Sequence, residues 1–582
     1  MRQPPRERVR AAAAAGIVIA ALVAASATWF VAAYLPIYPD EIAYRILTSR
    51  GFTDGLTVMN VYPTCVRSFT APMPYSWVPA KALDFLLFGM IQDPTLLRAI
   101  GLATVGVAFG LALILFPVNS SPVRAVISLR GANRGLVVLL VSSLGIIPLS
   151  LVMTRPEGLA LVLVLALAIT HVRVMATQDF RYARWCVPPL FFLFMTWLYS
   201  LHPKMLFLAP LVLYLGWLIF RRLFSGATSY LWIALLVGCI AEAYLFWRIS
   251  YTCPENPAIQ TYFHNLSLDP ALVFSDPTAF FQQAGTNLAN STAYLYHAGF
   301  HKSYPIDWLP RTSRGGIGVL GKLANSVGLT ALLWLTISVG TAAIKDICHL
   351  IRQRTNLPQS NIMALLIVVA VVPYAALNSS KHFYEVAFVW PMLAIAYGLQ
   401  VGTGQLRRAR VFTAVLAVAV IASAAAVASS FGREFISEGF LGKGISITRF
   451  SDSATAREVA LLEEKCNIPR DAAGHFVVLD DVTYTYFSRT RNPVLITWLH
   501  VAAEGLDKLQ YLRQMGSSGV ITRCGYLPEP FRQRSLRVQF SKGYGGVADG
   551  ELDLCCVAKE RLNGNSAAEV KMMRVLATDE KQ

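Results

Sequence analysis

A series of long apolar stretches limits the fold of this chain more than any other feature of its sequence. The first covers residues 11–35, which exceeds the roughly 20 residues that a helix needs to cross a bilayer. It is longer than the apolar part of a signal peptide, so we expect it to be retained. Only 15% of all residues are charged, against roughly 25% in soluble proteins. The chain is therefore predicted to be a polytopic α-helical membrane protein with about eleven spans, near residues 11–35, 96–117, 135–153, 158–172, 186–201, 205–220, 229–248, 318–343, 361–377, 385–402 and 411–431.

Basic residues gather in alternate connections between these spans. Those connections hold 18 basic and three acidic residues, so about +15 of the net charge of +17 lies on one side of the predicted membrane. The positive-inside rule makes that side cytoplasmic, with the N-terminus inside and the C-terminus outside. The Ala- and Arg-rich composition favours a bacterial inner membrane. Because the basic residues are explained by the orientation of the protein in the membrane, their number does not indicate a nucleic-acid partner.

The chemically rich segments all fall on the opposite, outer side. Two long loops, 36–95 and 249–317, lie there. The first contains an amphipathic segment that predicts helices in the plane of the membrane surface, with a packing lid as the alternative. The aromatic residues of the second suit either a sugar-binding surface or a membrane-interface belt. His297 and His301 within it have the spacing of metal ligands on one helix face, but interface histidines without metal are the favoured interpretation.

Carboxylates and bases also recur at the outer ends of the predicted spans. Asp40 and Glu41 follow the first span, and charge so close to hydrocarbon is costly enough that we expect it to be functional. The polar residues of each short outer turn, taken alone, are explained by contact with water. Taken together, the ends of several helices in a bundle can border one cavity. The turns contribute Arg155 and Glu157, then His202 and Lys204, and then Lys381, His382, Tyr384 and Glu385.

Three of these segments carry a resemblance to a known family. YPDE (38–41) follows the first span, RPE (155–157) occupies an outer turn, and KHFYEVAFVWP (381–391) leads into a late span. This arrangement resembles the GT-C glycosyltransferases, in particular protein O-mannosyltransferases, lipid A aminoarabinose transferases and rhizobial galacturonosyltransferases. The resemblance covers roughly residues 11–431. KHFYE departs from the family, in which a His or Arg-Tyr pattern is commoner at that turn.

The resemblance implies transfer of a sugar from a polyprenyl-phosphate donor to a hydroxyl of an envelope glycan, lipid or protein, with inversion. Asp40 would be the general base, and Glu41 would position the acceptor or stabilise positive charge on the sugar. Cationic side chains must bind the leaving phosphate, and the candidates are Arg155, Lys381 and His382, followed by Lys204 and Arg67. Tyr384 and Glu385 complete the predicted substrate-binding residues. No cofactor is required on this reading, although Glu157 could bind sugar hydroxyls or a divalent cation.

The C-terminal part differs in character from the predicted membrane domain, residues 1–431. Apolar runs at 475–481, 519–525 and 552–559 predict strands, and residues 457–466 and 502–516 predict helices, so 432–565 are expected to form a small periplasmic α/β domain. Residues 566–582 are predicted to be a disordered tail. Six of nine cysteines fall on the outer side, where disulfides form. Cys65 with Cys253 and Cys466 with Cys524 are two of the pairings open to them.

Three other functions fit parts of the pattern. A transporter or flippase of lipid-linked sugars would use charges within its spans, and Glu242 is the main candidate for such a charge. An O-antigen ligase or polymerase would also act on lipid-linked sugars outside the membrane, but it would not need Asp40 and Glu41. A receptor with an outer sensing domain is the third. Loss of turnover in Asp40→Asn, with normal folding, would favour the transferase over all three.

Overall fold

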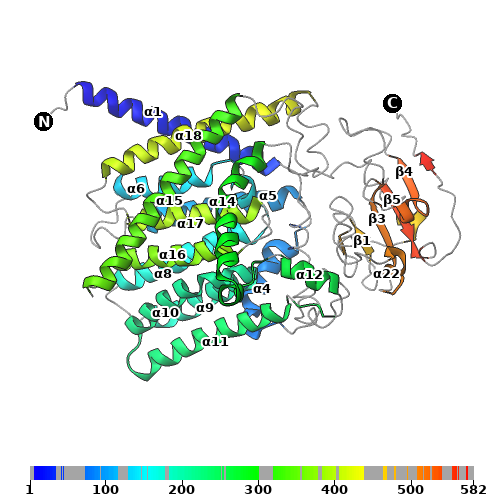
Figure 1. Cartoon of the computed structure of the whole chain (residues 1–582), viewed down its shortest axis with the longest axis horizontal. Coiled ribbons are helices and arrows are strands. Elements are labelled where there is room, and N and C mark those ends of the chain that lie inside the picture. The colour runs from blue at the N-terminus through cyan, green and yellow to red at the C-terminus, as the bar shows by residue number, and fades with distance from the viewer. Residues whose placement is uncertain are drawn as a thin grey trace.

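The computed structural model of this chain consists of a large helical bundle and a smaller sheet beyond one end of it (Figure 1). The structure describes residues 5–34, 41, 44, 73–91, 94–115, 129–145, 147–153, 155–176, 182–250, 252–254, 257–265, 267–300, 319–353, 357–377, 383–400, 406–437, 463–467, 477–479, 494–495, 507–514, 517–524, 527, 529–539, 554–559, 562 and 572–574.

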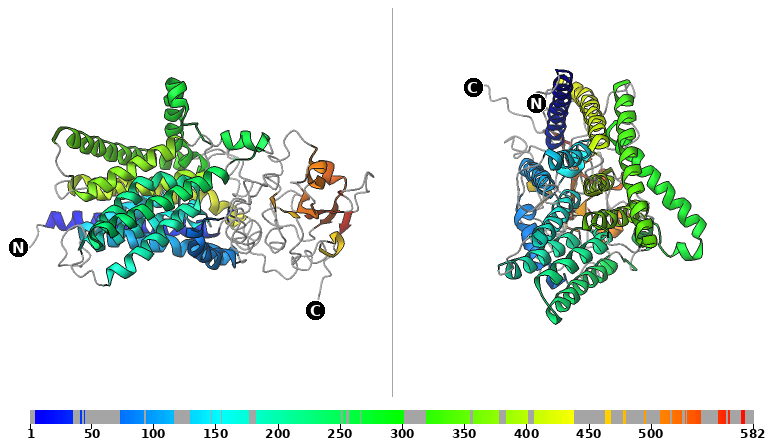
Figure 2. Two further views of the ribbon diagram at one scale, coloured as in Figure 1. Left: turned by 90° about the horizontal axis from the view of Figure 1, so that it is seen from below. Right: turned by 90° about the vertical axis from the view of Figure 1, so that its left-hand side faces the viewer.

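The longer helices of the bundle lie side by side and alternate in direction (Figures 1 and 2). They are α1 (Pro5–Tyr34), α5 (Pro94–Leu115), α6 (Leu129–Ser142), α8 (Pro156–Ala176), α9 (Ala183–Leu201), α10 (Ala209–Leu223), α11 (Ala227–Ser250), α15 (Val319–Gln353), α16 (Gln359–Ala376), α17 (Phe383–Gln400) and α18 (Leu406–Ser437). Shorter helical elements connect them, namely η1 (Tyr75–Trp77), α4 (Val78–Asp84), the π-helical η2 (Phe85–Gly89), α7 (Ile147–Val152), η4 (Pro203–Leu208), α12 (Pro257–Asn265), α13 (Leu272–Ser275) and the longer α14 (Pro277–Phe300).

Eight helices within the described ranges are long and apolar enough to cross a membrane. Each coincides with a predicted span, which confirms a polytopic helical protein but not the number eleven. The other three predicted spans also fall on helices, one of them divided in two. Residues 135–153 divide into α6 and α7 because the chain turns at Gly145, whose φ is 52°. The helix α9 is continuous and contains Pro188 and Pro189, and α17 contains Pro391.

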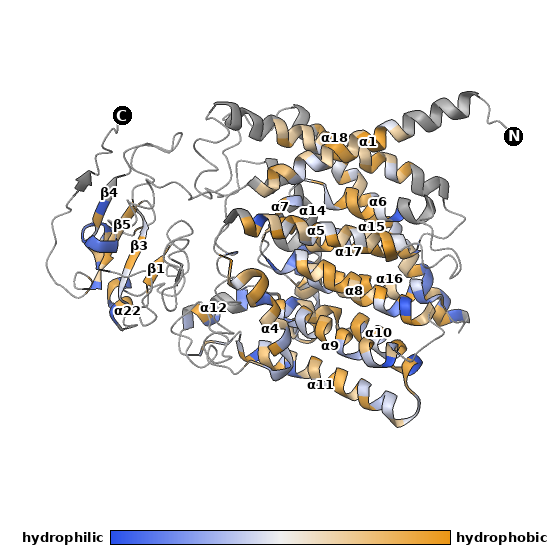
Figure 3. Ribbon diagram, turned by 180° about the vertical axis from the view of Figure 1, so that it is seen from behind, coloured by the Kyte–Doolittle hydropathy of each residue, from blue (hydrophilic) through white to orange (hydrophobic). Residues whose placement is uncertain are grey.

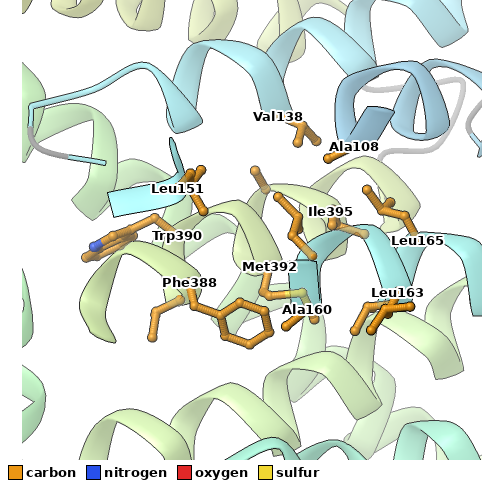
Figure 4. Close-up of a cluster of buried hydrophobic side chains, with 14 of the residues drawn as sticks. Ala108, Val138, Leu151, Ala160, Leu163, Leu165, Phe388, Trp390, Met392 and Ile395 are labelled. Carbon is orange, nitrogen blue, oxygen red and sulfur yellow. The ribbon is translucent and has the colours of Figure 1, made fainter. Parts of the chain in front are cut away.

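The core of the bundle forms around α17. Almost every side chain from Ala387 to Leu399 is buried, which explains why this helix is apolar on all sides. Figure 4 shows Phe388, Met392 and Ile395 of α17 packed with side chains of α8. By contrast, α11 and α15 expose large apolar side chains, as at Leu231 and Ile351, on the outside of the bundle. The hydrophobic colouring along these helices in Figure 3 is that of a surface suited to lipid.

The two ends of the bundle receive different segments. The elements α4 and α12 lie at the end nearest the sheet, whereas the N-terminus and the turn between α10 and α11 lie at the opposite end (Figure 1). This separation matches the alternation that the basic residues predicted. We refer to these as the sheet end and the basic end.

The sheet has six strands in the order β2-β1-β3-β5-β4-β6. The strands are β1 (Val477–Leu479), β2 (Val494–Leu495), β3 (Gly519–Arg523), β4 (Leu536–Gln539), β5 (Leu554–Ala558) and β6 (Met572–Arg574), accompanied by α22 (Lys508–Gln514) and α23 (Glu529–Arg532). The predicted α/β character is confirmed, with β1, β3, β5 and α22 in predicted elements. β6 lies within residues 566–582, which were expected to be a disordered tail. It is a strand there because it pairs in parallel with β4, with Met572 opposite Arg537.

Two disulfides join this region across β5. They link Cys466 to Cys556 and Cys524 to Cys555. The pairing of Cys466 with Cys524 considered from the sequence is therefore wrong. Successive residues of a strand point to opposite faces, so Cys555 and Cys556 reach partners on different sides of the sheet. Cys253 is also disulfide-bonded, and its suggested partner Cys65 lies outside the described residues.

Candidate functional site

Glu41 forms a buried ion pair with the first turns of α5. Its two carboxylate oxygens accept hydrogen bonds from the Nη1 and Nη2 atoms of Arg98, both at 2.7 Å. Glu41 is 2% exposed and Arg98 is 4% exposed. Such bidentate geometry is the strongest form of this interaction, and it offsets the cost of removing both charges from water. The pair therefore holds the residue that follows Asp40 against the beginning of a membrane-spanning helix.

A second pair lies where α7 gives way to α8. Arg155 Nε is 3.3 Å from a carboxylate oxygen of Glu157, and both side chains are largely buried. The backbone approaches closely around this turn. An added Cβ at Gly158 would lie 2.5 Å from the Leu151 carbonyl oxygen, and one at Gly101 of α5 would overlap the Val152 carbonyl group. Glycine at both positions lets α5, α7 and α8 meet directly beside the two ion pairs.

A third pair lies on α4, in the segment predicted to be an in-plane helix. Lys81 Nζ is 3.1 Å from Asp84 Oδ2 and donates to the Ser200 carbonyl oxygen at 3.1 Å. The Trp197 indole N–H donates to the other Asp84 oxygen. Burial raises the pKa of Asp84 by more than Lys81 and Trp197 lower it. These contacts fasten α4 to the last turn of α9.

Further contacts fix the beginning of this segment on α11. Trp77 is 1% exposed and packs edge-on against Phe246, with ring centroids 4.7 Å apart. Ser76 donates a hydrogen bond of 2.6 Å to Glu242. Glu242 is the acidic residue within a span that a transporter would use. In the structure it accepts a hydrogen bond from the segment that precedes α4. The first outer segment is thus attached to α9 and α11 by both apolar and polar contacts.

Tyr44 is affected by the charges of two of these ion pairs. Its side chain is buried, and burial raises the pKa of its phenol well above the ordinary value. The charges of Asp84 and Glu157 raise that pKa further, whereas Arg155 lowers it. The phenol therefore lies within electrostatic range of the pairs on α4 and at the start of α8. It is also three residues from Glu41 in the chain.

Lys204 lies between α9 and α10, in a turn that is predicted to face the outer side of the membrane, as are the segments that hold the ion pairs. Its ammonium is 5.8 Å from the centre of the Tyr374 ring near the end of α16. Its backbone N–H donates to His202 Nδ1 at 3.2 Å. The end of α16 is in turn held by the second outer segment, since Leu268 donates to the Leu377 carbonyl and Asn287 to the Ala376 carbonyl. Lys204 is therefore positioned next to the segment that precedes the predicted 378–385 turn.

The remaining predicted residues fall outside what the structure describes. These are Asp40, Arg67, Lys381 and His382. Tyr384 and Glu385 belong to α17, but their side chains are not described, and neither is that of His297. Within the described residues, no group of three or more His, Cys, Asp or Glu side chains is arranged to hold a metal ion.

Sequence reasoning missed Arg98, Lys81, Asp84 and Tyr44. A signal was present for the first three, because a charged residue within or beside an apolar segment needs a partner. Lys81 and Asp84 also have the spacing of neighbours on a helix face. Nothing in the sequence distinguished Tyr44 from the other aromatic residues of the first loop.

Comparison with known proteins finds similarity to solved structures. No protein family and no curated protein matches the sequence. Among solved structures, the chain is similar to the crystal structure of ArnT from Cupriavidus metallidurans bound to undecaprenyl phosphate. The match covers 96% of this chain and 99% of ArnT, with 13% identity and a TM-score of 0.42.

Proposed function

We propose that this protein is a membrane glycosyltransferase of the GT-C kind, which moves a sugar from a polyprenyl-phosphate donor to a hydroxyl on the outer side of the membrane. The observation that carries the proposal is the presence of three buried ion pairs, Glu41–Arg98, Arg155–Glu157 and Lys81–Asp84, in a bundle of membrane-spanning helices. Burying charges beside hydrocarbon costs free energy, so it is typical of functional sites. A lipid phosphate whose tail stays in the bilayer presents its headgroup at this depth.

The proposed reaction is one displacement. Asp40 removes the proton from the acceptor hydroxyl as its oxygen forms a bond to the anomeric carbon of the sugar. The bond between that carbon and the phosphate oxygen breaks, and the polyprenyl phosphate leaves with the electron pair. With one displacement and no covalent enzyme intermediate, the configuration inverts. The Glu41–Arg98 pair supports this role because it attaches the residue that follows Asp40 in the chain to the beginning of α5.

Cationic side chains would stabilise the charge that develops on the leaving phosphate. Lys204, Lys381, His382, Arg155 and Arg67 remain the candidates. Arg155 is the least suited of the described ones, because Glu157 already neutralises its charge at 3.3 Å. Lys204 is the other described candidate, and its ammonium lies 5.8 Å from the centre of the Tyr374 ring. The acceptor is an envelope glycan such as lipopolysaccharide, a lipid or a protein, and no cofactor is needed unless Glu157 binds a divalent cation.

The cysteines support the orientation that the proposal requires. Every described cysteine in a disulfide, namely Cys253, Cys466, Cys524, Cys555 and Cys556, lies in a segment predicted to face outward. The free cysteines of the described chain, Cys186, Cys239 and Cys348, lie in predicted spans or on the predicted cytoplasmic side. Disulfides form in the periplasm and not in the cytosol. The sheet end would then face a bacterial periplasm.

The decisive experiment is sugar transfer by the purified protein in lipid. Wild type and Asp40→Asn are incubated with polyprenyl-phosphate sugars, undecaprenyl carriers first, and with envelope lipids as acceptors. We expect transfer by wild type and a loss of about 10²- to 10⁴-fold in Asp40→Asn, the usual contribution of a general base. Asp276→Asn is the matched control, since Asp276 is exposed and accepts from the Ala279 N–H, a role that Asn can keep.

Two results would count against the proposal. One is the absence of transfer with every donor, although the protein is folded. The other is Asp40→Asn retaining full activity, which would remove the proposed base. The first result would move the assignment to a transporter or flippase of lipid-linked sugars.

A further inference from the structure

The hydroxyl of Tyr44 is buried without a protein partner among the residues that the structure describes. The side chain is only 7% exposed. Buried tyrosine hydroxyls ordinarily make a hydrogen bond, because removing an O–H group from water without replacing its partner costs free energy. A ligand that accepts a hydrogen bond from this hydroxyl would remove the cost. An unpartnered hydroxyl in a candidate site therefore indicates a ligand-binding position.

The charges around Tyr44 restrict what that ligand is. Three carboxylates among the described residues of the candidate site are each paired with a cation: Glu41 with Arg98, Glu157 with Arg155 and Asp84 with Lys81. The formal charges of these six side chains therefore cancel. These six described side chains therefore offer a bound phosphate no net positive charge. An uncharged group with several oxygen atoms suits the surroundings better.

We infer that Tyr44 is a sugar-binding residue, whose hydroxyl donates a hydrogen bond to an oxygen atom of the sugar that is transferred. The inference rests on the proposed transferase function and deepens it, because it separates the site into two parts. The sugar lies at Tyr44, and the phosphate is held by cations elsewhere, of which Lys204 is the described candidate. The raised pKa keeps the phenol protonated, as a donor must be.

Tyr44→Phe tests the inference because it removes only the hydroxyl. Tyr199→Phe is a matched control, since the Tyr199 hydroxyl is also buried without a partner in the described part of the chain. Tyr199 belongs to α9 and takes no part in the three ion pairs. Two quantities are measured for each variant: kcat/KM for sugar transfer, and Kd for undecaprenyl phosphate, which carries no sugar.

We expect Tyr44→Phe to lower kcat/KM about 5- to 10-fold, the equivalent of one hydrogen bond, and to leave Kd for undecaprenyl phosphate unchanged. Tyr199→Phe should change neither quantity. Once the donor is known, a donor that lacks the contacted sugar hydroxyl should be transferred equally well by wild type and Tyr44→Phe. That equality shows that the two changes remove the same hydrogen bond.

Each other outcome overturns the inference. Unchanged transfer by Tyr44→Phe shows that the hydroxyl binds no substrate, and a weaker Kd for undecaprenyl phosphate assigns it to the phosphate. A Tyr44→Phe protein that fails to fold shows that the hydroxyl has a structural partner. These results leave the proposed function standing as long as wild type transfers sugar. If wild type neither binds the carrier nor transfers sugar, both proposals fail together.

Discussion

Arginine is used in opposite ways at the two ends of the helical bundle. At the sheet end, Arg98 is 4% exposed and its guanidinium is held by both carboxylate oxygens of Glu41. At the basic end, Arg221 is exposed, stacks 5.3 Å from the centre of the Trp217 ring and donates to the Tyr230 hydroxyl. Arg184 is likewise exposed and donates to the Leu223 carbonyl oxygen.

The difference separates two reasons for charge in a membrane protein. Exposed arginines among aromatic residues set orientation and lie where anionic headgroups and water solvate them. Buried arginines must be neutralised by carboxylates, at a free-energy cost that folding alone does not require. The sheet end therefore has the properties of a site and the basic end those of an anchor.

The largest expected effect is in thiol labelling, which shows which end of the bundle faces the cytoplasm. Each cysteine is expected to be either labelled or not labelled. Cys186 and Cys348 are free and exposed; Cys348 lies on the predicted cytoplasmic side, and Cys186 lies at the cytoplasmic end of the predicted span 186–201. A membrane-impermeant maleimide should label neither in intact cells and both after permeabilisation. The Cys186→Ser, Cys348→Ser double variant identifies the labelled positions. Labelling in intact cells would reverse the assignment of the two ends.

Arg98→Ala and Arg221→Ala compare the two uses of arginine directly. Arg98→Ala leaves the Glu41 carboxylate buried without its partner and should cost about 3–5 kcal/mol. Arg221→Ala removes an exposed contact and should cost about 0–1 kcal/mol. The midpoint of unfolding in a denaturing detergent measures both. Equal losses would contradict the distinction between site and anchor.

Gly101→Ala should destabilise by about 1–3 kcal/mol, because its Cβ would force α5 away from the Val152 backbone. Gly106→Ala in the same helix is the control, since an added Cβ there meets nothing within 4 Å. A thermal unfolding midpoint for each variant tests the close packing that supports Arg98 and Arg155. The packing would be refuted by Gly101→Ala being as stable as Gly106→Ala.

The smallest effect is a pH dependence centred on Asp84. Its folded pKa is raised by burial, so the folded protein binds this proton more tightly than the unfolded chain does. The stabilising contribution is full below the unfolded pKa of about 3.9 and is lost as pH rises through the raised folded value. Asp84→Asn keeps an oxygen that accepts from Trp197, and its stability should vary less across this range. An identical pH profile in both proteins would show that Asp84 is not the group responsible.

The sequence alone determined the class of this protein, and it predicts an orientation in the membrane. Length and apolarity of a segment are local properties, and hydrocarbon imposes the same requirement on every spanning helix. The eight described spans were therefore predictable, as were β1, β3 and β5. The division of residues 135–153 at Gly145 was not, because periodicity does not show where a helix will break.

Only the tertiary structure decided which polar residues meet. Glu41 and Arg98 are 57 residues apart, and Trp197 lies 113 residues from Asp84, so no local pattern connects either pair. The same holds for the disulfides, since Cys466 and Cys556 are separated by 90 residues. The sequence named Asp40, Glu41, Arg155 and Glu157 because charge beside an apolar segment is costly wherever it occurs. The choice of partner, and the burial of Tyr44 among those charges, depends on how helices distant in the chain pack together.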